Sequence, residues 1–267
     1  DLRRSRGLGD VYKRQVPAKR LTRHLETSRA AFELTRGVFL ERSLHEGSTY
    51  RTSAAWRLLS RVWTLPLLGS LHSHNKRHLK HPKLTQFFNR YATYNGSDPH
   101  RAPAMMHVIP HLEHGIGTFL PEGGMRSIPL HLEKLGRALG VTFLTDTPAA
   151  RILHAEGRVT GVEDAQGQVH HADWVVSNAD LHPTYRRLLP DLKAPERILN
   201  QERSTSGVIF YWGVKGTHPE LSLHNILFSK DYRAEFNRIQ HEGTPGEDPT
   251  VYINITSKEL PQDAPEG

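Results

Sequence analysis

The stretch FLPEGGMRSIPLHLEKLGRALGVTFLTDTPAARIL, residues 119–153, contains the pattern that decides the fold. Two adjacent glycines, Gly123 and Gly124, open a segment in which isoleucine and leucine recur at helical spacing as far as Leu139. Gly140 stands where a glycine commonly ends a helix, and the apolar run VTFLT at 141–145 has the length of a short strand. A helix that leads into such a strand is the second half of a βαβ unit, so we expect 141–145 to join a parallel sheet.

Three further strands are predicted between residues 149 and 178, in the runs AARILHA, RVTGVEDA and QVHHADWVVSN. Short glycine turns at 156–157 and 166–167 separate them, which is typical of antiparallel hairpins. The last run ends in WVVSN, which is apolar on both faces and predicts a buried central strand. Its carboxyl end, at Ser177 and Asn178, falls where ligands bind in open α/β sheets. We expect a core here of Ile128, Leu132, Leu135, Phe143, Val162, Val175 and Val176.

Composition excludes several classes of site. The chain of 267 residues has no cysteine, so disulfides, thiolate metal sites, iron–sulfur clusters and a cysteine nucleophile are all excluded. No apolar run approaches the roughly 18 residues of a membrane span, and neither a G-x-S-x-G elbow nor a phosphate-binding P-loop occurs.

Positive charge is concentrated in the first 90 residues, which contain 19 Lys and Arg against 6 Asp and Glu. The run AAWRLLSRVWTLPLLGSL at 54–71 mixes basic residues with Trp and Leu, which suits a helix at a membrane surface. A solvated basic face over an ordinary buried stripe is the alternative, whereas nothing resembles a nucleic-acid-binding module. If the membrane interpretation holds, four apolar side chains will be exposed within a basic rim. These are Trp56, Leu59, Trp63 and Leu67, rimmed by Arg57, Arg61, Lys76 and Arg77.

The 18 histidines raise the question of a metal site. His107, His111 and His114 follow an H-x₃-H-x₂-H spacing that could place three imidazoles on one helical face. Pro110 interrupts that run, and no H-E-x-x-H pattern occurs. We therefore expect structural or solvent-facing histidines and no metal.

The order of glycine-led helix, short strand, meander and VVSNAD resembles the middle of the FAD-dependent amine oxidase and phytoene desaturase superfamily. Three flanking stretches resemble the bacterial carotenoid desaturases, with the hydroxycarotenoid 3,4-desaturase branch nearest. They are FFNRYATYNGSDPHRAPAMMHVIPHLEHGIGTFLPEGGM, STSGVIFYWGV and LHNILFSKDYRAEF. The resemblance covers nearly all of residues 20–267.

The resemblance implies an α/β fold with an incomplete FAD-binding Rossmann-type domain, a β-meander, and a substrate domain of helices and a mixed or antiparallel sheet. Residues 119–182 would be the returning segment of the FAD domain. Residues 16–118 would be the helical, membrane-facing part of the substrate domain, and 183–267 its remaining, truncated part. Residues 1–15 resemble translated sequencing-adapter sequence, and the Gly7-Leu-Gly9 within them is only half of a dinucleotide fingerprint. We interpret the chain as the middle of a longer protein.

The implied reaction is FAD-dependent desaturation of a carotenoid, with quinone or oxygen as the electron acceptor and with the protein cytoplasmic and peripherally bound to a membrane. Cofactor contacts would come from Gly123, Gly124, Ala149, Ser177 and Asn178, although the glycines could serve only to make a tight turn. Substrate contacts would come from Met125, Phe210, Tyr211 and Trp212, the last three on a strand where they could equally be ordinary sheet core. No catalytic side chain is assigned.

Two alternatives to a carotenoid desaturase remain open. One is a non-catalytic, membrane-peripheral relative that binds lipid or isoprenoid. The other is a flavin amine oxidase or retinoid-type oxidoreductase. We expect the chain by itself to be inactive.

Overall fold

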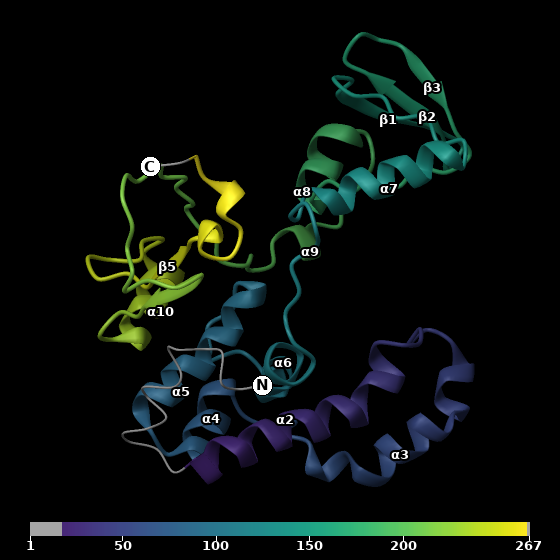
Figure 1. Ribbon diagram of the computed structural model, residues 1–267. Coiled ribbons are helices and arrows are strands. Elements are labelled where there is room, and N and C mark those ends of the chain that lie inside the picture. The colour runs from purple at the N-terminus through teal and green to yellow at the C-terminus, as the bar shows by residue number, and fades with distance from the viewer. Residues whose placement is uncertain (1–17, 266–267) are drawn as a thin grey trace. The chain divides into compact units, whose positions relative to one another are not determined.

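The computed structural model describes residues 18–265, and the segment resembling adapter sequence lies outside them. The chain divides into two compact units, one of residues up to 118 and from 204 onward, the other of residues 119–203. Figure 1 shows their elements, and each unit is described by itself. No helix among the described residues combines the length and apolar character that crossing a bilayer requires.

Helices form the first part of the larger unit. They are α2 (Ala18–Phe39), α3 (Ser53–Arg61), α4 (Leu71–Leu79), α5 (Pro82–Asn89) and α6 (Ile109–His111), with shorter turns η1 (Gly47–Arg51), η2 (Val62–Thr64), η3 (Arg90–Asn95), η4 (Ala104–Val108) and η5 (Leu112–Ile116). Local chemistry sets their ends. Ser70 and Ser73 form a reciprocal capping box at the start of α4, and Lys80 ends that helix in a left-handed conformation. Pro82 occupies the first turn of α5, where its missing N–H costs nothing.

The hydrophobic core of the chain lies in this unit. Helix α2 packs against α4, α6 and η4, while α4 also packs against α5. The core side chains are Leu21, Leu71, Leu79, Leu84, Phe88, Tyr91, Ala92 and Ala102. These side chains therefore form a packed core among the helices of the larger unit.

A hairpin and a helix complete the larger unit. Strands β4 (His224–Leu227) and β5 (Val251–Asn254) pair antiparallel, with α10 (Tyr232–His241) between them in sequence, and η7 (Thr256–Lys258) and η8 (Pro261–Asp263) follow. Both carboxylate oxygens of Glu235 on α10 accept hydrogen bonds from Thr250, one from its backbone N–H and one from its hydroxyl, each at 2.7 Å. Gln86 of α5 donates to the Ser229 carbonyl at 2.9 Å, which joins this part to the helices.

The smaller unit contains the predicted helix and the predicted meander. Helix α7 spans Ser127–Ala138, and β1 (Ala149–Ala155), β2 (Arg158–Asp164) and β3 (Val169–His171) form one antiparallel sheet in that order. The register pairs Ile152 with Val162, and Ile152 is buried. Three short elements follow, α8 (Leu181–Pro183), η6 (Thr184–Leu188) and α9 (Glu196–Leu199). The prediction of an antiparallel meander is confirmed.

Two predicted strands do not form. Residues 141–145 and 174–178 have no strand pairing, so neither joins a sheet within the described residues. The predicted core around them is wrong as well. Val176 is 92% exposed and Leu132 63% exposed, while Val162 and Val175 are only half-buried. Ile128, Leu135 and Phe143 are also exposed.

The physical reason is that a parallel strand needs at least one neighbouring strand to pair with, in a sheet whose faces are covered by helices. Among residues 18–265 no strand lies beside 141–145 or 174–178. Only a local contact covers part of this surface, where Phe143 stacks beneath the Arg137 guanidinium at 5.0 Å. The apolar pattern is therefore present, but its covering sheet is not among the described residues.

Candidate functional site

The glycine pair before α7 forms a turn that only glycine accommodates without strain. Gly123 and Gly124 have φ values of +77° and +74°, in the left-handed region. Gly124 donates its N–H to the Pro121 carbonyl at 2.9 Å and accepts at its own carbonyl from the Ser127 hydroxyl at 2.8 Å. A Cβ added to Gly124 would meet no atom within 4 Å. Backbone conformation thus requires glycine here, and the space beside Gly124 is open.

The start of α7 adds a favourable electrostatic environment for an electron-rich group. Its first turn contains no acidic residue, and the N-cap residue Arg126 provides no side-chain cap. The partial positive charge of the helix N-terminus is therefore not neutralised by a neighbouring carboxylate of that turn. Met125, between the glycines and the helix, is exposed beside this opening.

Ala149 is the first residue of β1, and its position depends on Asp164. The two residues are paired across the meander. The buried carboxylate of Asp164 accepts from the N–H groups of Gln166 and Gln168 and hydrogen-bonds to His170 Nε2 at 2.9 Å. The His170 hydrogen bond holds the pKa of Asp164 below its ordinary value. The hydrogen bonds of Asp164 hold the turn at residues 164–168, next to the end of the sheet that contains Ala149. Ala149 is exposed there.

Ser177 is anchored although its segment forms no strand. Its hydroxyl hydrogen-bonds to that of buried Thr184 at 2.8 Å, and η6, which begins at Thr184, packs against β1. Asn178 is exposed. The structure therefore places Ser177 and Ala149 on connected elements of one unit. Among the described residues, no hydrogen bond joins either of them to Gly123 or Gly124.

The other three substrate candidates belong to the larger unit. Phe210, Tyr211 and Trp212 lie in an unpaired segment and are strongly exposed, and the rings of Phe210 and Trp212 are 6.0 Å apart. The prediction that they lie on a strand is wrong, because no strand of the described residues pairs with this segment. The alternative of ordinary sheet core fails for the same reason.

A surface of exposed tryptophan and leucine lies around α3 and η2. We call it the Trp/Leu surface, formed by Trp56, Leu59, Trp63, Leu67 and Leu68. Trp63 is 75% exposed, and all four rim cations named above are exposed as well. The predicted exposure is confirmed. Leu67 and Trp63 also line a shallow hollow together with Ser73, His74 and Arg77.

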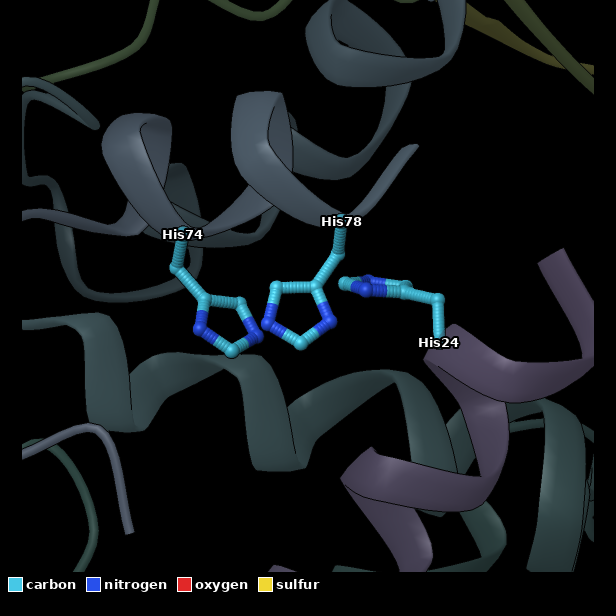
Figure 2. A group of neighbouring side chains, drawn as sticks. All are labelled: His24, His74 and His78. Carbon is cyan, nitrogen blue, oxygen red and sulfur yellow. The ribbon is translucent and has the colours of Figure 1, made fainter. Parts of the chain in front are cut away.

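A cluster of histidines in the helical core was missed by sequence reasoning. One nitrogen from each of His24, His74 and His78 lies within 4.8 Å of the others (Figure 2). Both nitrogens of His24 and Nε2 of His74 are buried without a protein hydrogen-bond partner. Burial, followed by the charges of neighbouring histidines, lowers the pKa of both His24 and His74 to about 3. The only signal in the sequence was the spacing of His74 and His78, four residues apart on a helix.

The sequence H-x₃-H-x₂-H does not form such a group. His107 is buried with Nδ1 on the Ala104 carbonyl at 3.0 Å, and His114 hydrogen-bonds through Nε2 to the Tyr91 hydroxyl at 2.9 Å. Tyr91 also accepts from Arg90, which forms an ion pair with Glu113 at 2.6 Å. Among the described residues, the histidines whose ring nitrogens lie close together are therefore His24 of α2 and His74 and His78 of α4.

Comparison with known proteins gives a consistent picture. A family of flavin-containing amine oxidoreductases matches residues 19–241. A 1-hydroxycarotenoid 3,4-desaturase from Flavobacterium sp. (strain P99-3) is 48% identical over 92% of this chain and 50% of its own length. A zeta-carotene-forming phytoene desaturase from Myxococcus xanthus is 34% identical over 79% of this chain and 41% of its own. A 4,4'-diapolycopene oxygenase from Methylomonas sp is 34% identical over 72% of this chain and 39% of its own. The chain thus spans about half or less of the length of these relatives.

Proposed function

Because the chain belongs to the flavin-containing amine oxidoreductase family, we propose that the whole protein binds FAD and desaturates a carotenoid, with a hydroxycarotenoid as the favoured substrate. The observation that carries the proposal is the 48% identity to a 1-hydroxycarotenoid 3,4-desaturase across 92% of the chain. The phytoene desaturases among the relatives support the same substrate class.

The residues of the smaller unit fit a flavin. The open space beside Gly124 lets a flat ligand approach the backbone, and the N-terminus of α7 favours electron density there. Gly123 and Gly124 would contact the cofactor directly, with Ala149, Ser177 and Asn178 contributing from the sheet side. Bound FAD supplies a hydride acceptor, which a C–C desaturation requires.

The chain's own residues would position the substrate and exclude water. A polyene offers no charge to grip, so orientation depends on apolar contact rather than on acid–base groups. Met125 beside the glycine turn and the aromatic segment 210–212 would supply such contacts. The proton released with the hydride would pass to solvent or to a base that we do not assign, and quinone or oxygen would reoxidise the flavin.

The uncovered apolar surface of the smaller unit supports a further structural proposal. Residues 141–145, 174–178 and the apolar side of α7 would be buried in the whole protein against a parallel flavin-binding sheet. Exposed apolar surface on this scale usually marks an interface. The relatives are about twice as long as this chain, which leaves enough sequence for such a sheet.

The Trp/Leu surface supports contact of the protein with a membrane, where a carotenoid would enter. Amphipathic tryptophan and leucine insert at the lipid boundary, while the arginines and lysines of the rim attract anionic headgroups. We propose peripheral attachment through this surface.

The test of the function is made in cells that produce a 1-hydroxycarotenoid and express the full-length protein. We expect extracted pigments with one more conjugated double bond, and a purified protein that absorbs near roughly 450 nm, as oxidised flavins do. Gly124→Val should reduce desaturation strongly, because it places a branched side chain in the open space. Gly47→Val is the matched control, since Gly47 has an ordinary φ and no atom within 4 Å of its added Cβ. A protein with neither flavin absorbance nor any effect on the polyene would leave the non-catalytic isoprenoid-binding alternative.

A further inference from the structure

We propose that His24, His74 and His78 form a binding site for one divalent transition-metal ion of the zinc class, which joins helix α2 to helix α4. Sequence patterns predicted no metal in this chain. The site lies within the helical part of the larger unit, and the proposal does not depend on the flavin or on the carotenoid.

The backbone places the three side chains together. His74 and His78 are four residues apart on α4, so they project from the same face of that helix. His24 projects from α2, which packs against α4, and Figure 2 shows its ring directed toward the other two. The rings of His74 and His78 lie 4.3 Å apart, and the centroid of His24 lies 5.8 Å from that of His74.

The buried nitrogens are the observation that points to a ligand. His24 is 0% exposed, yet neither Nδ1 nor Nε2 has a protein partner, and Nε2 of His74 is likewise buried and unpartnered. Most buried polar atoms in native proteins are hydrogen-bonded, and leaving one unpaired is unfavourable. A metal ion would satisfy one nitrogen of His24 and one of His74 at once.

The chemistry of the set selects the ion. Neutral imidazole is a common ligand of transition-metal ions, and each of the three side chains offers one ring nitrogen to the group. No carboxylate belongs to the group. Such an all-nitrogen set disfavours Mg²⁺ and Ca²⁺, which require oxygen ligands, and favours Zn²⁺, Co²⁺, Ni²⁺ or Cu²⁺.

The geometry requires only small adjustments. Zinc–nitrogen bonds of about 2.0–2.1 Å in a tetrahedral site separate ligand nitrogens by roughly 3.4 Å. The nitrogens now lie within 4.8 Å of one another, so binding would draw them closer through rotation of the rings about their side-chain torsions. His74 also lines the hollow beside Trp63 and Arg77, so an ion and its fourth, solvent ligand have a route in. His107 packs on His74 at 4.4 Å, but it does not belong to the group whose ring nitrogens lie within 4.8 Å of one another.

The experiment uses the purified 267-residue chain, freed of metal with a chelator and then dialysed. Titration with Co²⁺ should saturate at one equivalent and produce visible absorption between roughly 500 and 650 nm, which reports tetrahedral nitrogen coordination. Zn²⁺ should abolish that absorption by competition. Zn²⁺ alone should raise the thermal midpoint by several degrees, because binding to the native state stabilises it.

Two variants and a matched control decide the assignment. His78→Gln alters a half-buried side chain and should weaken Co²⁺ binding at least tenfold while the circular dichroism spectrum is unchanged. His24→Phe places an apolar ring beside Phe88, which His24 already contacts edge-on at 4.7 Å, and should abolish binding. The double variant His45→Gln and His241→Gln removes two exposed histidines and should bind as the parent does.

Three results would overturn the proposal. They are a parent chain without saturable binding, a His78→Gln variant that binds as tightly as the parent, and an equal loss of binding in the surface double variant. If His24→Phe does not fold, His78→Gln gives the answer alone.

Discussion

Glu113 is a half-buried carboxylate that is hydrogen-bonded to the helical part of the larger unit. Its carboxylate accepts from Arg90 at 2.6 Å and from the Tyr94 hydroxyl at 2.7 Å. Burial alone would raise its pKa, but the Tyr94 hydrogen bond and the Arg90 charge outweigh burial and hold the pKa below its ordinary value. Glu113→Gln should therefore lower the free energy of unfolding by about 2–3 kcal/mol at pH 7, as expected when one partner of a largely buried pair is lost.

The pH dependence of this effect has a definite sign. A carboxyl group with a depressed pKa in the folded state stabilises above its unfolded-state pKa and loses that contribution as the pH falls through the folded-state value. Urea unfolding of the parent and of Glu113→Gln should therefore converge below about pH 4. Glu133→Gln is the control, because its ion pair with Arg137 is exposed and worth at most about 0.5 kcal/mol. A constant difference between pH 7 and pH 3 would contradict the assignment.

Gly124 provides a second prediction at the scale of one residue. Gly124→Ala places a Cβ on a backbone with φ of +74°, which costs about 1–2 kcal/mol in the left-handed region. The smaller unit should lose that much stability in urea, as measured by hydrogen exchange of its meander amides. Gly47→Ala has no such backbone strain and should change stability by less than about 0.5 kcal/mol.

Residue-scale inference from the sequence succeeded where the cause was local. The left-handed glycines of the turn and the hairpin at Glu156 and Gly157, both with positive φ, follow from backbone chemistry within a few residues. His24 and His74 are 50 positions apart, and only the packing of α2 on α4 brings them together. No pattern along the chain could have found that pair.

Helix α7 and helix α5 differ sharply in how they are packed. Leu132 on α7 is exposed, whereas Phe88 on α5 is fully buried in the core. Leu132→Lys should leave the stability of the 267-residue chain unchanged within about 0.5 kcal/mol. Phe88→Ala should cost about 3–5 kcal/mol because it leaves a cavity.

The contrast extends to the full-length protein. There, Leu132→Lys should reduce flavin content, because the proposal places this face against the flavin-binding sheet. If Leu132→Lys lowered the free energy of unfolding equally in the full-length protein and in the 267-residue chain, α7 would already be covered in the shorter chain. Denaturant unfolding and the ratio of flavin to protein absorbance are the two measurements.

The Trp/Leu surface yields a prediction about lipid. Trp56→Ser together with Trp63→Ser should reduce sedimentation of the full-length protein with vesicles containing anionic lipid, and added salt should weaken the parent's binding. Leu40→Ser is a useful control, since Leu40 is 68% exposed but lies outside the Trp/Leu surface. Vesicle binding that is insensitive to both tryptophans would favour the alternative of a solvated basic face.

At the scale of elements, periodicity predicted a helix that follows Gly123 and Gly124 and runs as far as Leu139, and α7 forms there over Ser127–Ala138. The two glycine turns predicted the meander. The strands at 141–145 and 174–178 failed for a different reason. Their apolar pattern was correctly recognised, but strand formation depends on a neighbouring strand rather than on the segment itself. The pattern therefore predicted that these two segments need to be buried, but no strand of the described residues covers them.

For the molecule as a whole, the two units differ in how complete they are. The larger one has a closed helical core, whereas the smaller one has little buried apolar area apart from Ile152 and Leu199. The sequence also contains no complete G-x-G-x-x-G loop. The purified 267-residue chain should therefore retain no flavin, even when it is expressed with added FAD. Stoichiometric flavin in this chain would contradict our assignment of the smaller unit.

The uncovered face of α7 and of residues 174–178 has a consequence for the fate of the polypeptide in a cell. A newly made chain that displays so much apolar surface binds chaperones and self-associates until that surface is covered. Proteases remove such a species faster than a closed fold. The 267-residue chain made alone should therefore accumulate poorly and turn over quickly, and its half-life should lengthen when the segments that bury this face are present. A pulse-chase experiment would compare the half-life of the 267-residue chain with that of the full-length protein.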